Sequence, residues 1–109
     1  MAVMNKELFR LHAEVCKALS SAKRLEILNI LRHKEMSAGD IVAKMKIPKA
    51  NVSQHLAVLR KAGIVHARRN GLNIYYSISN QKVTRACDLM REVLIEHHLQ
   101  KGKVLRRLG

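Results

Sequence analysis

The hydrophobic periodicity of the chain changes at Gly63 and changes again after residue 78. Before Gly63 the apolar side chains recur at helical spacing, as at Leu25, Leu28 and Leu31. From 64 to 78 they alternate with polar side chains on both sides of Asn70-Gly71, a pair typical of two-residue hairpin turns. After 80 the helical spacing returns. The pattern predicts a mainly α fold with a small β-hairpin.

The expected order is helix, helix, short helix, helix, two-stranded hairpin and long helix. Ser37 followed by Asp40 resembles a capping box, Pro48 stands where the fourth helix begins, and Gly63 is a left-handed cap. A chain of 109 residues has room for one domain, so we expect a single domain over 1–109. Its segments are 1–19 (first helix), 37–62 (helix-turn-helix), 64–78 (wing) and 80–98 (last helix).

The charge distribution points to a polyanionic partner. Lys and Arg number 21 against eight Asp and Glu, which gives a formal net charge of +13. Between Asp40 and Asp88 there is no acidic residue at all. Such a balance favours nucleic acid first and an anionic membrane surface second.

Two short helices joined by a tight turn and followed directly by a hairpin describe a winged helix-turn-helix. The second of these helices enters the major groove of DNA in such folds. Gln and Asn pair with adenine, Lys binds phosphate or guanine, and arginines at a hairpin tip grip the backbone or the minor groove. The residues that we expect to bind DNA are Lys49, Asn51, Ser53, Gln54, His55, Arg60, Lys61, Arg68, Arg69 and Asn70.

The segments KALSSAKRLEILNIL and SAGDIVAKMKIPKANVSQHLAVLRKAGIVHARRNGLNIYYSIS resemble the ArsR-type family of winged-helix repressors over roughly residues 10–98. The resemblance implies a homodimer formed through the first and last helices, with double-stranded DNA containing an inverted repeat as its partner. It also implies autoregulatory repression near the protein's own promoter. A metal, metalloid or thiol-reactive signal would release the DNA.

The sequence departs from that family where metal-sensing members bind their ion. The paired cysteines of the third helix are replaced by Ser37 and Gly39, which are not soft-metal ligands. Asp88 is followed by Met90 where a second family site has histidine. We therefore expect neither zinc nor any other cofactor.

Cys16 and Cys87 allow two interpretations. A buried cysteine is most often a small inert hydrophobe. Alternatively, the two thiols form a sensor, because both lie on the helices expected to form the dimer. In that case Lys17, Lys82 and Arg85 would lower a thiol pKa.

His97 and His98 are weak candidates for a metal site at the dimer seam. The more common role of such histidines is that of cations favoured by the C-terminal helix dipole.

Other functions are less compatible with the sequence. There is no nucleophile–base pairing, no paired carboxylates and no phosphate-binding glycine loop, so we do not expect an enzyme. No segment has the length and hydrophobicity to span a bilayer, and two cysteines without an export signal indicate a cytoplasmic protein. The remaining alternatives are a constitutive, architectural DNA-binding protein and a winged-helix module that binds protein or RNA.

Overall fold

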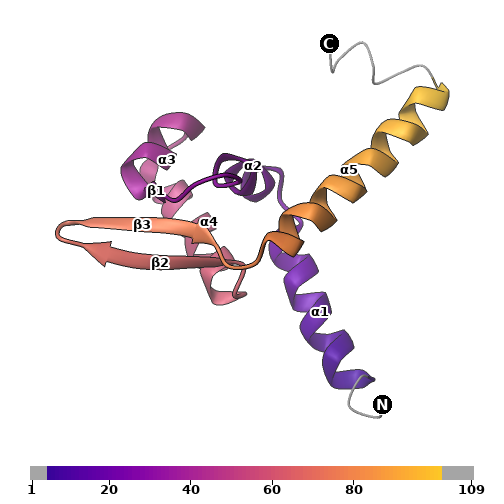
Figure 1. Ribbon diagram of the computed structural model, residues 1–109, viewed down its shortest axis with the longest axis horizontal. Coiled ribbons are helices and arrows are strands. Elements are labelled where there is room, and N and C mark those ends of the chain that lie inside the picture. Colours follow the sequence, from indigo (N-terminus) through magenta and orange to yellow (C-terminus); the bar gives the residue numbers. More distant parts are fainter. Residues whose placement is uncertain (1–4, 102–109) are drawn as a thin grey trace.

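The computed structural model describes residues 5–101, with side chains for residues 5–99. Residues 1–4 and 102–109 of the predicted domain lie outside the described residues, as does most of the basic C-terminal tail. The elements are α1 (Lys6–Leu19), α2 (Ala22–Ile30), β1 (Met36–Ser37), α3 (Ala38–Met45), α4 (Lys49–Lys61), β2 (Val65–Asn70), β3 (Asn73–Ile78) and α5 (Gln81–Lys101) (Figure 1). They form a winged helix-turn-helix.

The molecule consists of a body and two arms. The body comprises residues 22–78, and the arms are α1 and α5, which project on the side opposite to the tip of the β2–β3 hairpin (Figure 1). The radius of gyration is 16.0 Å, whereas a compact domain of 100 residues has about 13 Å. The arms therefore extend well beyond the body.

The predicted two-stranded hairpin is present as β2 and β3, and a short third strand, β1, which the sequence pattern did not predict, joins it. The strand order is β1-β3-β2, all antiparallel, and β1 pairs Met36 with Tyr76 and Ser37 with Tyr75. A strand of two residues is too short to show an alternating pattern in the sequence. Its pairing depends on the long-range contact with β3. The consequence is that the wing is attached to the start of α3.

The hairpin turn lies one residue later than predicted. Asn70 pairs with Asn73, so the loop is Gly71-Leu72 rather than Asn70-Gly71. Gly71 has φ +65°, and Lys46 is the only non-glycine described residue with positive φ. Positive φ at the first loop position alone fits a type II′ turn, in which glycine takes that position.

Two predicted caps are confirmed. The Ser37 hydroxyl accepts a hydrogen bond from the backbone N–H of Asp40 at 3.1 Å. Gly63 has φ +78°; its N–H donates to the Arg60 carbonyl, and the N–H of Ile64 donates to the Leu59 carbonyl. These two bonds form a Schellman motif, which ends α4 and turns the chain into the wing.

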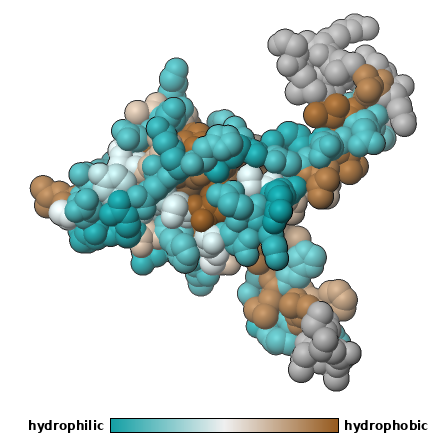
Figure 2. Space-filling view, viewed as in Figure 1, coloured by the Kyte–Doolittle hydropathy of each residue, from teal (hydrophilic) through white to brown (hydrophobic). Residues whose placement is uncertain are grey.

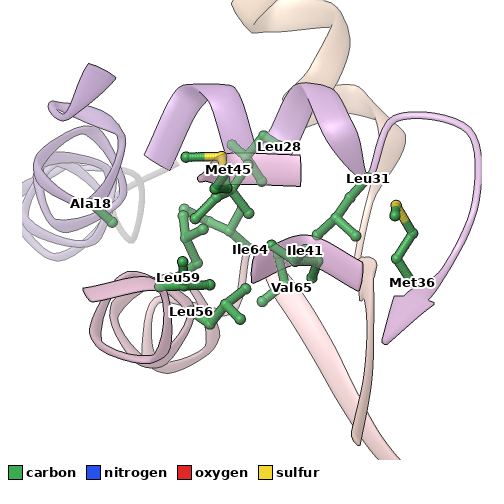
Figure 3. Packing of buried hydrophobic residues seen from close by; sticks show 12 residues of the cluster. Ala18, Leu28, Leu31, Met36, Ile41, Met45, Leu56, Leu59, Ile64 and Val65 are labelled. Carbon is green, nitrogen blue, oxygen red and sulfur yellow. The ribbon is translucent and has the colours of Figure 1, made fainter. Parts of the chain in front are cut away.

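One apolar cluster fixes how α4 is rotated about its axis. Val52, Leu56 and Leu59 are buried against side chains from α2, α3 and the start of β2 (Figure 3). Burial of each large aliphatic side chain contributes about 1.5–3 kcal/mol. With this side of α4 held in the core, its polar side must face solvent.

Candidate nucleic-acid interface

The solvent side of α4 carries the polar residues that the sequence singled out. Lys49, Asn51, Ser53 and Gln54 are all exposed on the first turns of the helix. Pro48 precedes them as the N-cap residue, immediately before the first helical position. The helix therefore offers donors and acceptors of the kind that read base edges, on a scaffold fixed by the core.

Two cations lie at the other end of α4. Arg60 and Lys61 are exposed in its last turn, where cations interact favourably with the helix dipole. Neither forms an ion pair with a residue that the structure describes. Both charges are thus available to an external anion.

The two wing arginines differ in their surroundings. Arg68 makes a bidentate pair with Glu35, with Nε to Oε2 at 2.7 Å and Nη2 to Oε1 at 2.6 Å. Its guanidinium also lies 4.8 Å from the centre of the Tyr75 ring. The hydrogen bond with Arg68 lowers the pKa of the Glu35 carboxyl, and the same pair raises the pKa of Arg68.

Arg69 is exposed and forms no ion pair within residues 5–99, and Asn70 beside it is exposed as well. The wing therefore presents one free and one neutralised guanidinium. The segment between Asp40 and Asp88 has no acidic residue of its own, but the fold places the Glu35 carboxylate against its Arg68.

His55 has a different position from its neighbours on α4. Its side chain is half-buried, and its Nδ1 lies 3.3 Å from Nη1 of Arg24 in α2. Arg24 was not among the predicted site residues. Nothing in its local sequence distinguishes it from the other arginines, since its contacts come from α1 and α4.

A second missed pair joins the body to α5. Arg32 binds Asp88 through two hydrogen bonds of 2.8 and 2.6 Å, and Arg91 approaches the same carboxylate at 3.4 Å. The hydrogen bond with Arg32 lowers the pKa of Asp88 and raises that of Arg32. The carboxylate at this family metal position is thus bound to a guanidinium, and the residues around it do not fit a metal ion.

The two cysteines line one apolar groove between α1 and α5. The groove has a volume of about 450 Å³, and Cys16 is exposed whereas Cys87 is partly buried. The residues lining it are His12, Val15, Cys16, Leu19, Leu25, Val83, Ala86, Cys87, Met90, Arg91 and Leu94.

Burial raises the pKa of the Cys87 thiol, and the nearby Asp88 raises it further against the opposing effect of Arg91 and Arg32. The expectation that local cations lower the pKa of this thiol was wrong. Loss of hydration outweighs the cations, and those that act on Cys87 are Arg91 and Arg32 rather than Lys82 and Arg85.

His97 and His98 lie next to each other near the end of α5. Their rings meet edge to face with centroids 5.1 Å apart. Within the described part of the chain, no group of three His, Cys, Asp or Glu side chains is placed to hold a metal ion. In the same part, no helix is both long and apolar enough to cross a membrane.

Comparisons with known proteins place the chain in a family. The family model described as "Bacterial regulatory protein, arsR family" matches residues 21–67. The HTH-type transcriptional regulator Rv0081 of Mycobacterium tuberculosis is 35% identical over 91 residues, which cover 83% of this chain and 80% of that protein. The transcriptional repressor SmtB homolog of Synechocystis is 35% identical over 100 residues, covering 92% of this chain and 72% of the relative.

Solved structures agree with the sequence matches. The crystal structure of Rv0081 has a TM-score of 0.78 at 33% identity and covers 89% of this chain and 98% of that one. The solution structure of the homodimeric winged helix-turn-helix DNA-binding domain Mb0332 of Mycobacterium bovis has a TM-score of 0.76 at 34% identity and covers 84% of each chain. The exposed face of α4, the basic wing and these matches lead to one conclusion: the chain belongs to the ArsR family and is a DNA-binding transcriptional regulator.

Proposed function

We propose that the protein is a homodimeric repressor that binds a pseudo-palindromic operator, with one α4 helix reading each half-site. The observation that carries this proposal is the polar face of α4, which is exposed beside the basic wing while the opposite face is buried. In this role the protein regulates its own promoter by excluding RNA polymerase from it.

The side chains divide into base readers and phosphate contacts. Asn51, Ser53 and Gln54 have the chemistry to read base edges from the first turns of α4. The cations neutralise phosphates and release counterions, which gives affinity with a strong dependence on salt. The residues in this second group are Lys49, Arg60, Lys61 and Arg69. Asn70 is a polar contact, and Arg68 is already paired with Glu35.

The arms supply the dimer. Large apolar side chains are exposed along both of them (Figure 2), whereas most of those in the body lie in the core, with Leu72 at the hairpin tip and Val58 as exceptions. The related domain Mb0332 is homodimeric. A twofold dimer places its two reading helices about one turn of DNA apart, roughly 34–36 Å. The exposed residues are Leu8, Phe9 and Leu11 on α1, and Leu89, Met90, Val93, Leu94 and Leu99 on α5.

The signal that suits this dimer is a thiol-reactive compound or a metalloid acting at Cys16 and Cys87. Both thiols line the groove between the two arms, so a change there alters the element that sets the spacing of the reading helices. A peroxide or a disulfide oxidant would take two electrons and two protons from the thiols. Cys16 is exposed and reacts first, because Cys87 is partly buried and its pKa is raised.

Fluorescence anisotropy on the DNA upstream of the protein's own gene tests the proposal. We expect tight binding to this duplex, weak binding to a random duplex, and loss of the tight binding after mild oxidation. Cys16→Ser and Cys87→Ser should keep the binding and lose the response to oxidant.

Equal affinity for both duplexes would contradict sequence-specific repression and favour an architectural role. Specific binding that resists oxidation in the wild-type protein would contradict the thiol signal alone. Titration with metal ions would then test whether His97 and His98 form a metal-sensing site.

A further inference from the structure

Arg24 bridges three helices through one guanidinium group. Its Nε donates to the carbonyl of Ala18 at 2.6 Å, and its Nη2 donates to the carbonyl of Lys17 at 3.4 Å. Its Nη1 lies 3.3 Å from Nδ1 of His55. The arginine belongs to α2, the two carbonyls lie in the last turn of α1, and the histidine lies in the middle of α4.

The chemistry of each contact defines its role. The last carbonyls of a helix lack partners within that helix and form its negative end, so they attract a cation. A guanidinium is always protonated and only donates hydrogen bonds, so Nδ1 of His55 is the acceptor in this contact. The rigid planar guanidinium donates the three hydrogen bonds at once in fixed directions, which the flexible ammonium of lysine does not do.

We propose that Arg24 is a positioning residue for DNA recognition, which fixes the orientation of α4 relative to α1. His55 is its acceptor and contributes to recognition through this contact rather than by touching a base. The inference rests on the proposed function, because the orientation matters when α1 joins two protomers and each α4 reads one half-site. Loosening the contact lets the reading helix tilt, so the dimer discriminates less between sites and between half-site spacings.

The contact with α5 is of another kind, and this separates Arg24 from Arg32. Arg32 joins the body to α5 through a carboxylate and has no side-chain hydrogen bond to a described residue of α4. Among the described residues, Arg24 alone has side-chain hydrogen bonds both to an arm and to the reading helix.

The test uses a duplex selected by the wild-type protein from a random-sequence library, a random duplex, and the selected duplex with one base pair added between its half-sites. Arg24→Lys should weaken binding to the selected duplex by about tenfold, the scale of one charged hydrogen bond. Binding to the random duplex should change by less than about twofold, because non-specific binding depends on phosphate contacts, which a positioning residue does not make. The preference for the selected spacing should shrink.

Variants of His55 show whether the contact itself is responsible. His55→Leu removes the acceptor and should lose as much as Arg24→Lys, and the double variant should lose no more, because the two changes break one interaction. His55→Gln keeps an acceptor and should restore much of the discrimination. Arg10→Lys is the matched control, since Arg10 is exposed and pairs with Glu7 and Glu14 of its own helix.

Several results would overturn the inference. Equal weakening on selected and random DNA with a reduced salt slope would make Arg24 a phosphate contact. A lower melting temperature with unchanged discrimination and spacing preference would make it a packing residue. Additive losses in the double variant would remove His55 as its acceptor. A wild-type library that yields no paired half-sites would instead overturn the proposed function, and this inference with it.

Discussion

The body buries most of its large apolar side chains, whereas the two arms expose many of theirs. In the body Ile27, Ile41 and Leu59 are completely buried, whereas on α5 Leu89 and Met90 are each 62% exposed. The core of the body is complete within one chain, and the arms offer surface that a single chain does not cover. The difference teaches that the fold of one protomer is enough to position the proposed reading helix α4, whereas the exposed apolar surface of the arms is available for association with a second copy.

The largest expected effect is in the core of the body. Leu59→Ala should destabilise the protomer by about 2–5 kcal/mol, because it leaves a cavity in a site with no exposure. Urea denaturation followed by circular dichroism measures the loss. Val58→Ala, at a partly exposed neighbouring position, is the matched control. A loss of stability below about 1 kcal/mol for Leu59→Ala would show that the core of the body is not tightly packed around this side chain.

A charge on an arm should separate association from folding. Leu94→Glu places a carboxylate on the exposed apolar face of α5 and should weaken dimerisation by about 2 kcal/mol or more, as expected for a central interface residue. Sedimentation velocity should show monomers while the helical content of the body persists. A dimer as tight as the wild type would place the interface elsewhere.

Within the proposed DNA-binding surface, α4 and the wing should differ in their contribution to specificity. Gln54→Ala should cost about 1–3 kcal/mol on the selected duplex and relax specificity there, because this residue faces solvent from a fixed helix. Arg69→Ala should weaken binding to all duplexes equally and reduce the salt slope by about one. Anisotropy titrations over a range of salt concentrations measure both. Equal losses on selected and random DNA for Gln54→Ala would show that it does not read a base.

The smallest expected effect concerns the bond between the body and α5. The pKa of Asp88 is lowered by Arg32 in the folded protein, so the pair stabilises the fold above the unfolded carboxyl pKa of about 4. That contribution is lost as pH falls through the lower, folded value. Asp88→Asn should therefore melt at a lower temperature than the wild type at pH 7, and the difference should shrink as the pH falls below about 4.

Calorimetry across this pH range makes the comparison with Asp88→Asn. Glu92→Gln is the control, since Glu92 is exposed on the same helix and in no ion pair with a described residue. A constant difference between Asp88→Asn and the wild type at every pH would show that Asp88 acts through packing rather than through its charge.

Local signals in the sequence were enough for the helices, for the hairpin and for the exposed face of α4, but not for the two-residue strand β1. The spacing of Val52, Leu56 and Leu59 put the polar residues of that helix outside, and Gly63 ended it in a left-handed turn. Both follow from interactions within about one helical turn, which the order of residues determines. The hairpin was also predictable, although its loop lies one residue later because Asn70 keeps its pairing with Asn73.

Tertiary structure alone decided the contacts that connect these elements. Arg24 meets His55 across 31 positions, Arg68 meets Glu35 across 33, and Arg32 meets Asp88 across 56. No local pattern selects one arginine over another for such a partner, because a guanidinium bonds whichever carboxylate, carbonyl or imidazole the packing brings near. The sequence determined which face of α4 is polar and exposed, and the packing decided which side chains hold that helix in place.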